Sequence, residues 1–256
     1  MKLALISDIH ANLPALQAVL DDIDARGPDQ VICLGDLVGY APWPNEVVTE
    51  LRRRGIVCIA GNYDEGVGLD SDDCGCAYKT DADKANGARS IAFTNQQVTD
   101  ETRAYLRSLP RHFGLTFREG RSSDARPFQV LLVHGSPRKI NEYLFEDRAD
   151  ASFLRMMESE DADLMCFGHT HLPFHRAITD PDGRWGVRHV VNTGSVGKPK
   201  DGDPRAAYVM LDIVPHRDEP LGVEVVRVEY DVEGAAGAVE SSPLPDAFAE
   251  ALRVAR

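Results

Sequence analysis

The sequence predicts an α/β fold made of two mixed β-sheets flanked by helices. The first 60 residues alternate apolar runs with segments of helical spacing, which is typical of a parallel sheet with helical crossovers. Residues 174–230 contain apolar runs separated only by short turns, which favours antiparallel pairing and a second sheet packed on the first. Polar side chains also follow several apolar runs directly, as they do where a ligand site lies at one edge of a sheet.

The N-terminal segment is predicted to form a β-α-β-α-β unit. Its first strand, residues 2–6, is almost entirely apolar, as expected for a strand that is covered on both faces. Asn12 is a suitable N-cap for the next helix, Pro14 fits the first turn, and Gly27 ends it. The later elements of the unit are a strand at 30–34, a helix from Pro44 to Gly55 and a strand at 56–60.

Residues 66–95 interrupt this alternation. They contain an acidic run at 70–73, the triplet Cys74-Gly75-Cys76 and a predicted helix from about 81 to 93. We interpret them as an insertion, or lid, that overhangs the strand ends. The insertion is expected to belong to a single domain of residues 1–256, because the chain shows no internal repeat and no linker long enough to separate domains.

The remaining elements follow from the same patterns. Helices are expected at 99–109 and 149–159, strands at 129–133 and 164–167, and an exposed loop at 119–127. Four further strands are expected at 174–178, 185–191, 206–213 and 223–230, with turns at 181–183, 202–204 and 215–220. We expect these four strands to pair as an antiparallel meander in the second sheet. The Ala-rich tail from Val232 is expected to end in a helix from about Pro245.

Composition excludes some classes of function. The chain carries 28 basic and 41 acidic residues, a formal charge of −13, which argues against a generic nucleic-acid or anionic-membrane surface. No run approaches the roughly 20 apolar residues of a membrane span, and the N-terminus is interpreted as a strand rather than a signal peptide. Cys33, Cys58 and Cys166 lie in apolar runs and are expected to be buried thiols of a cytoplasmic protein.

Seven side chains of metal-binding type come directly after predicted strands. Because the carboxyl ends of parallel strands meet at one edge of a sheet, we expect these side chains to lie close together. They are Asp8, His10, Asp36, Asn62, His134, His169 and His171. The alternative is that polar residues stand at strand ends by coincidence, but five such groups in order along the chain speak against it.

This mixture of imidazole, carboxylate and amide groups predicts the class of metal. Mn²⁺, Fe²⁺, Co²⁺, Ni²⁺ and Zn²⁺ accept mixed nitrogen and oxygen ligands, whereas Ca²⁺ and Mg²⁺ prefer oxygen alone. Seven ligands are too many for one tetrahedral zinc ion. They suit two divalent transition-metal ions that share one carboxylate, and Asp36 is able to bridge them. Mn²⁺ is the leading candidate, with Fe, Ni, Co or Zn as alternatives.

The order of these groups resembles the calcineurin-like metallophosphoesterases. Five signature blocks match over residues 8–171: Asp8-x-His10, Gly35-Asp36, Gly61-Asn62, His134, and Gly168-His169-x-His171. Residues 35–44 and 192–208 resemble the bacterial and archaeal phosphodiesterase branch of this superfamily. The resemblance implies a four-layer αββα sandwich, in agreement with the two predicted sheets.

The resemblance also implies roles for individual residues. One metal would be held by Asp8, His10, Asp36 and His171, and the other by Asp36, Asn62, His134 and His169. Two such ions can hold the phosphate oxygens and lower the pKa of a bridging water, and the hydroxide would attack phosphorus in line. Asn62, Tyr63, Asp64 and His134 are the expected catalytic group.

The third block departs from the pattern of the superfamily. It usually reads Gly-Asn-His-Asp, with a histidine that assists the leaving group, whereas this chain has Tyr63 at that position. A tyrosine hydroxyl, with an ordinary pKa near 10, can donate to a phosphoryl oxygen but is a poorer proton donor than a histidinium. Diesters, anhydrides and aryl esters are therefore favoured over phosphoserine. The alternative is that Tyr63 only packs under the insertion.

Other charged and sulfur-containing residues are weaker candidates. Arg138 and Arg205 are expected to contact the substrate, and Lys198 and Lys200 are able to, although such side chains are often only solvated. The Cys74-Gly75-Cys76 triplet suggests a metal or redox pair. It lacks the second pair of ligands that a structural zinc site requires, so a local loop feature is favoured.

The predicted function is hydrolysis of phosphodiester or phosphoanhydride bonds in nucleotide-like small molecules. One alternative is a phosphomonoesterase or protein phosphatase, which the acidic run at 70–73 disfavours because it would repel acidic phosphopeptides. Another is a binding scaffold that has lost catalysis, which the complete set of seven ligands disfavours. Nothing in the sequence favours one oligomeric state over another.

Overall fold

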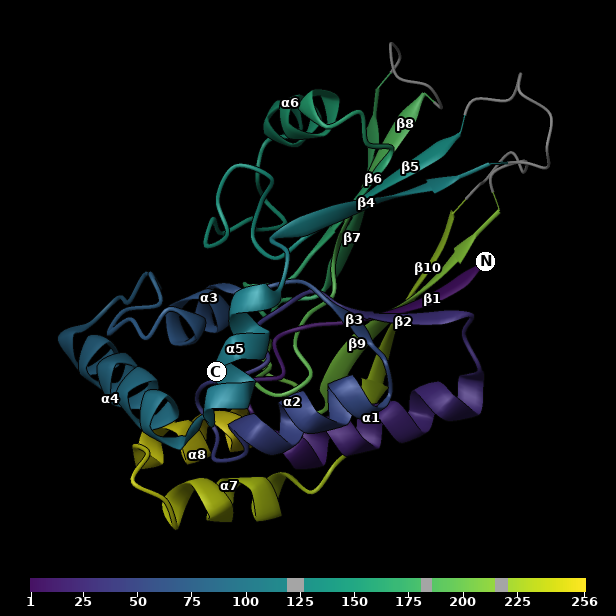
Figure 1. Cartoon of the computed structure of the whole chain (residues 1–256). Coiled ribbons are helices and arrows are strands. Elements are labelled where there is room, and N and C mark those ends of the chain that lie inside the picture. Colours follow the sequence, from purple (N-terminus) through teal and green to yellow (C-terminus); the bar gives the residue numbers. More distant parts are fainter. Residues whose placement is uncertain (119–126, 181–185, 215–220) are drawn as a thin grey trace.

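The computed structural model describes residues 1–118, 127–180, 186–214 and 221–256, and within them ten strands form two mixed five-stranded sheets (Figure 1). The first sheet has the strand order β10-β9-β1-β2-β3 and the second the order β4-β5-β6-β8-β7. The first sheet consists of β1 (Lys2–Ile6), β2 (Gln30–Cys33), β3 (Val57–Cys58), β9 (Ala206–Ile213) and β10 (Leu221–Val228). The second consists of β4 (His112–Phe117), β5 (Phe128–Val133), β6 (Leu164–Phe167), β7 (Phe174–Thr179) and β8 (Val187–Asn192).

Helices cover the outer faces of both sheets, so the predicted four-layer αββα arrangement is confirmed (Figure 1). In the described residues these are α1 (Leu13–Arg26), α2 (Pro44–Arg53), α3 (Asn62–Gly68), α4 (Asp81–Gln97), α5 (Asp100–Ser108), α6 (Asp150–Ser159), α7 (Val232–Glu240) and α8 (Asp246–Val254). The helices α1 and α2 lie on the first sheet, and α6 lies on the second. None of the helices in the described part of the chain is long and apolar enough to cross a membrane.

Alternation along the central strands divides the core into layers. Successive side chains of a strand point to opposite faces, so one strand can supply two interfaces. In β1, Leu3 and Leu5 pack between the sheets, whereas Ala4 and Ile6 pack under α1 and α2. β5 and β6 behave alike, with one face toward the first sheet and the other toward α6. This double burial explains why these strands are apolar throughout.

The predicted β-α-β-α-β unit is present. β1 and β2 run parallel, as do β2 and β3, and Asn12 caps α1 by accepting from the backbone N–H of Ala15. β3 is shorter than the predicted strand at 56–60. The N–H of Ile59 still donates to the carbonyl of Cys33, but that of Gly61 donates to the Asp64 carboxylate, so the pairing with β2 ends there.

The prediction that the last four strands form one meander is wrong. β7 and β8 pair antiparallel in the second sheet, but β9 and β10 belong to the first, where β9 pairs antiparallel with β1. β8 also runs parallel to β6. Short turns and alternating residues indicate antiparallel pairing, and they do not say which sheet a hairpin joins.

Three elements went unpredicted, namely α3, β4 and α7, and some expectations lie outside the described residues. β4 alternates Phe113, Leu115 and Phe117 with less apolar residues, a strand signal that was present in the sequence. α7 contains two glycines, which lower helix propensity, but Asp231 caps it by accepting from the N–H of Gly234. The expected loop at 119–127, apart from Pro127, the turns at 181–183 and 215–220, and the strand start at Trp185 lie outside the described residues.

Candidate metal centre

The seven predicted ligands lie together where strands of both sheets end. Each follows its strand within a few residues: Asp8 and His10 follow β1, Asp36 follows β2, Asn62 follows β3, His134 follows β5, and His169 and His171 follow β6. All seven are buried. The polar cluster therefore forms at the carboxyl ends of strands, as expected, but two sheets supply it rather than one.

The first group of ligands is Asp8, His10 and His171. One ligand atom from each lies within 4.8 Å of the other two. Nε2 of His10 lies 3.2 Å from Nε2 of His171, which in turn lies 3.3 Å from Oδ1 of Asp8. Two imidazole nitrogens and a carboxylate oxygen thus point at one small volume, which is a suitable set for a divalent transition metal.

The second group is Asp36, His134 and His169, again within 4.8 Å of one another. Asn62 joins it, since its Oδ1 lies 3.1 Å from Nε2 of His134. Asp36 connects the two groups: its Oδ2 lies 3.4 Å from Nε2 of His134 and 3.6 Å from Nε2 of His10.

Backbone carbonyls orient three of the histidines. In each, Nδ1 lies within hydrogen-bond distance of a carbonyl oxygen, which favours the tautomer with the proton on Nδ1. Nε2 then keeps its lone pair and faces the cluster, as in many metal sites. The pairs are His10 with Val38, His134 with Leu34, and His171 with Lys198.

Three buried polar atoms lack a hydrogen-bond partner among the described residues, and two of them belong to the cluster. These two are Oδ1 of Asp8 and Nε2 of His169. A buried polar atom without a partner costs free energy, so such atoms call for a ligand, an ion or a water. A cation would satisfy both, because one is a carboxylate oxygen and the other an imidazole nitrogen. The residues present therefore fit divalent metal ions.

Burial and neighbouring charges shift the pKa values of the histidines in opposite directions. Burial lowers the pKa of His10 and of His169 to about 3, so both imidazoles are neutral near pH 7 and free to bind a metal. Burial would also lower the pKa of His134, but Asp36 and Asp8 raise it to about 10. A metal must therefore displace a proton from His134, so the affinity of this group for metal increases with pH.

The backbone is strained at five of the seven ligands. Their φ angles lie in the left-handed region, which residues other than glycine rarely adopt and which costs of order 1–3 kcal/mol each. Such strain collects at functional sites. The five are Asp8 (52°), His10 (50°), Asp36 (54°), His169 (65°) and His171 (62°).

Two glycines allow the strand ends to approach closely. A Cβ atom added at Gly61 would lie 2.1 Å from Oδ1 of Asp36. One added at Gly168 would lie 2.3 Å from Oδ2 of Asp8, the oxygen that accepts from Ser7 and from the N–H of His169. Gly168 is thus the point where the β6 end of the second sheet touches the β1 end of the first.

The segment at 192–208 supports the loop that carries Asp8. The N–H of Val196 donates to the carbonyl of Ser7, and that of Gly197 donates to the carbonyl of Asp8. The Ser195 hydroxyl donates to the same Asp8 carbonyl at 2.7 Å. These bonds hold the loop in its strained conformation.

Asp64 and Tyr63 lie beside the candidate ligands, and both are hydrogen-bonded to other residues of the chain. The Asp64 carboxylate accepts from the N–H groups of Leu37 and Gly61, and so connects the loops that carry Asp36 and Asn62. Burial and the Asp36 charge raise the pKa of Asp64 to about 7. Tyr63 is fully buried, and its hydroxyl donates to Ser90 of α4 at 3.2 Å. These contacts favour positioning and packing, and catalytic roles for both residues stay predictions.

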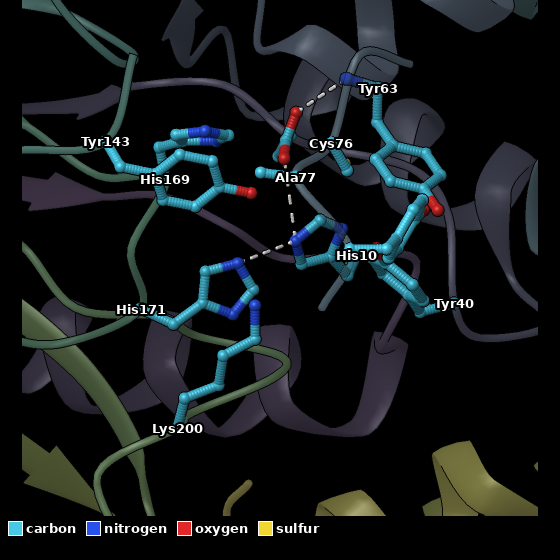
Figure 2. A pocket seen from close by; sticks show the side chains of 11 residues that line it. His10, Tyr40, Tyr63, Cys76, Ala77, Tyr143, His169, His171 and Lys200 are labelled. Carbon is cyan, nitrogen blue, oxygen red and sulfur yellow. Dashed lines mark hydrogen bonds and ion pairs between the residues drawn. The ribbon is translucent and has the colours of Figure 1, made fainter. Parts of the chain in front are cut away.

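A cavity of about 70 Å³ opens onto the cluster (Figure 2). Figure 2 shows the His10, His169 and His171 side chains around it, with Tyr143 beside His169 and Lys200 beside His171. The Tyr143 ring packs on His169 with centroids 4.1 Å apart. No pattern in the sequence singles out Tyr143, because it stands alone in an irregular loop. The insertion contributes Cys76, Ala77 and Tyr78 to the lining.

The two predicted arginines lie outside this cavity. The Arg138 guanidinium pairs with Glu142. Arg138 also lines a neighbouring groove, to which Asn62 contributes as well. The Arg205 guanidinium pairs with Asp203 and is about half exposed. Neither is among the residues that line the cavity over the cluster.

Comparison with known sequences decides the family. A sequence model described as the calcineurin-like phosphoesterase superfamily domain matches residues 1–215. The chain belongs to this superfamily. Its members are metal-dependent, which agrees with the two groups of candidate ligands. The superfamily supports a hydrolase that acts on phosphoesters.

Individual relatives agree with this assignment. An uncharacterized protein of Methanocaldococcus jannaschii is 34% identical over 268 residues, covering 99% of this chain and 98% of that protein. A phosphodiesterase of Escherichia coli is 26% identical over 222 residues, covering 83% of this chain and 88% of that one. The crystal structure of a metallophosphoesterase from Sphaerobacter thermophilus is 29% identical, with a TM-score of 0.73 and full coverage of both chains.

We expect Gly168→Ala to weaken metal binding. The added methyl group would overlap the Asp8 carboxylate, which must then move out of the first ligand group. Displacing a ligand in this way is expected to lower metal affinity by about 10- to 100-fold. Equilibrium dialysis with Mn²⁺ measures this. The matched control is Gly237→Ala in α7, where an added Cβ meets nothing within 4 Å. Unchanged Mn²⁺ binding by Gly168→Ala would contradict this account of the site.

Proposed function

We propose that this protein is a dinuclear metal-dependent phosphodiesterase that cleaves phosphodiester or phosphoanhydride bonds of nucleotide-like small molecules. The observation that carries the proposal is the position of Asp36. Its Oδ2 lies within 3.6 Å of an imidazole nitrogen in each ligand group, where a carboxylate can be shared by two ions. The two ligand groups and the superfamily support the metal dependence.

The proposed ligands of each ion are those that the resemblance to the superfamily implies. Asp8, His10, Asp36 and His171 would hold one ion, and Asp36, Asn62, His134 and His169 the other. Two divalent ions bound there would activate water and stabilise the charge that develops on the phosphoryl group. Mn²⁺ is the proposed ion, with Fe, Ni, Co or Zn as alternatives, because all of these ions accept a set that mixes imidazole with carboxylate and amide oxygen.

Lys200 is placed to bind the phosphate of the substrate. It lines the cavity beside His171, and burial lowers the pKa of its ammonium group. An ammonium group at reduced dielectric forms a strong charge-assisted hydrogen bond to a phosphate oxygen. Its neighbour Lys198 lies deeper, with its Nζ 4.9 Å from the Tyr40 ring centroid.

The size of the site supports a substrate larger than the cavity itself. About 70 Å³ is well below the roughly 300–1,000 Å³ of pockets that bury drug-sized ligands, and it suits a phosphoryl group. The neighbouring groove of about 460 Å³ shares Asn62 with the metal centre and includes Arg111, Arg138 and Lys139. Arg111 pairs with Glu65 and Arg138 with Glu142, so an anionic remainder such as a second phosphate would have to displace these carboxylates. Because it lines this groove, Arg138 is the better placed of the two predicted arginines, and Arg205 stays a prediction.

Residues 66–95 are proposed to act as a lid within a single domain of residues 1–256. Three consecutive residues of the segment, Cys76, Ala77 and Tyr78, line the cavity over the metal centre. The α4 residue Ser90 accepts a hydrogen bond from Tyr63, so the segment also contacts the third signature block. A nucleotide-like substrate would have to pass this segment to bring its phosphate to the cluster.

The proposed bond type follows from Tyr63. Its hydroxyl is committed to Ser90, and burial raises its pKa above the ordinary value, so it is a weak proton donor at neutral pH. Bonds with good leaving groups need less protonation of the departing oxygen. Phosphoanhydrides and aryl esters are of this kind, whereas an alkyl phosphodiester releases an alkoxide and would need its proton from another donor.

The protein is proposed to work in the cytoplasm. All five cysteines are free thiols, and Cys33, Cys58 and Cys166 are buried, as expected of a protein in a reducing compartment.

Metal-stripped protein is expected to hydrolyse bis(p-nitrophenyl) phosphate only after Mn²⁺ is added back. His169→Ala should reduce this rate by at least about 100-fold, because it removes a ligand of the second ion. Release of p-nitrophenol, with p-nitrophenyl phosphate as the comparison substrate, is the measurement. His189→Ala is the control, since His189 is a β8 residue that pairs with His175. Turnover of the monoester alone would contradict the phosphodiesterase proposal.

Lys200→Ala is expected to lower kcat/KM for the diester. Loss of a charge-assisted hydrogen bond costs about 1.5–3 kcal/mol, or roughly 10- to 100-fold. Steady-state kinetics compares this variant with Arg138→Ala and Arg205→Ala, which test the predicted contacts, and with the exposed Lys2→Ala as a charge control. Equal kcat/KM for Lys200→Ala and Lys2→Ala would exclude Lys200 as a phosphate contact.

A further inference from the structure

The triplet Cys74-Gly75-Cys76 brings two thiols together beside the metal centre. The two Sγ atoms lie 3.1 Å apart. Gly75 has a φ of 68°, a left-handed conformation that glycine adopts without strain. Its carbonyl accepts from Nδ2 of Asn141 at 2.6 Å, which fixes the turn against the loop that follows β5. The pair is therefore preorganised by a turn of defined shape.

The same turn orients Asn62, a proposed ligand of the second ion. Nδ2 of Asn62 donates to the Cys74 carbonyl at 2.9 Å and to Sγ of Cys76 at 3.3 Å. These two bonds identify the nitrogen end of the amide. The oxygen end, Oδ1, then faces Nε2 of His134 at 3.1 Å. The turn thus orients the amide of Asn62 through the Cys74 carbonyl and the Cys76 sulfur.

Small reagents can reach the pair. Cys76 lines the cavity over the metal centre, and both cysteines line a second cavity of about 480 Å³ between the turn and α4. Cys74 is buried, whereas Cys76 is partly exposed. The other cysteines differ in this respect, since Cys33 and Cys58 face each other on β2 and β3 inside the core.

We propose that Cys74 and Cys76 form a reversible disulfide that weakens the hold of Asn62 on the second metal ion. A disulfide requires an S–S distance of about 2.05 Å, so the sulfurs must approach by about 1 Å. That movement changes the position of the sulfur to which Asn62 donates. The coupling to the metal rests on the proposed function, whereas formation of the disulfide does not.

A low-molecular-weight disulfide is the proposed oxidant. The Cys76 sulfur, the more exposed of the two, attacks it, forms a mixed disulfide and releases one small thiol. The Cys74 sulfur then attacks the Cys76 sulfur and releases the second small thiol. The protein loses two electrons and two protons, and the two released thiols gain them. Transient disulfides of this kind are compatible with a reducing compartment.

The first experiment counts thiols. The reduced full-length protein is equilibrated with mixtures of reduced and oxidised glutathione, denatured in N-ethylmaleimide and weighed by intact mass spectrometry. The number of labelled thiols should decrease from five to three as the mixture becomes oxidising, with no adduct on the protein. Cys74→Ser and Cys76→Ser should abolish this loss of two thiols. Cys58→Ala, which removes the thiol facing Cys33, should retain it.

The second experiment measures Mn²⁺ binding to the oxidised and reduced forms by equilibrium dialysis. The oxidised protein should bind the second ion about 10- to 100-fold less tightly, the usual effect of losing a partner of a metal ligand. Reduction should restore the affinity. Cys76→Ala should bind this ion more weakly under all redox conditions, since it lacks the sulfur that orients Asn62.

Three results would overturn the proposal. The first is five labelled thiols at every glutathione ratio. The second is that two thiols escape labelling because they bind zinc. In that case zinc is found in the protein and its mass does not decrease by two hydrogens, which would indicate a thiolate metal site instead of a disulfide. The third is a disulfide with unchanged Mn²⁺ affinity, which would refute the link to Asn62. Failure of the protein to hydrolyse any diester would count against the proposed function, and both measurements here would still be decisive.

Discussion

The Asp36 carboxylate is the interaction on which the rest of the site depends. Its Oδ1 accepts from the N–H of Tyr63 at 2.9 Å, and its Oδ2 faces His10 and His134. One side chain thus connects the end of β2, the start of α3 and both groups of ligands. Gly61 makes this possible, because any side chain there would occupy the space of the carboxylate.

The cluster is a costly arrangement of buried charges. Burial alone would raise the pKa of Asp36, but His134 and His10 lower it to about 2, so the carboxylate stays ionised inside the protein. The Asp8 carboxylate is likewise kept ionised, mainly by His171, against the effect of burial. Strained backbone at five ligands adds to this cost. The two packed sheets and the bonds from residues 195–197 to the Asp8 loop offset it.

Much of the fold could be predicted from the sequence, because its signals are local. Asn12 and Pro44 mark helix starts, and continuous apolar runs mark strands buried on both faces. Which sheet a hairpin joins is a long-range property, so the partnership of β9 with β1 was missed. The closeness of the seven candidate ligands was predictable, because each comes directly after a strand.

The surroundings of the ligands were harder to predict. The contact of Tyr143 with His169 depends on the path of an irregular loop. The separation of the Cys74 and Cys76 sulfurs depends on a positive φ at Gly75, which the sequence only permits. Asp64 was expected to be catalytic, but whether a carboxylate at that position faces solvent or two backbone N–H groups depends on the tertiary structure.

Mn²⁺ stoichiometry and affinity in Asp36→Asn test the central claim most directly. If one carboxylate serves both ions, the unchanged protein binds two ions per chain, and Asp36→Asn weakens both by about 10- to 100-fold. The exposed Asp21→Asn serves as the charge-matched control and should bind both ions normally. Isothermal titration calorimetry with direct metal analysis gives both quantities. One ion per chain in the unchanged protein, or one ion still tightly bound by Asp36→Asn, would contradict the account.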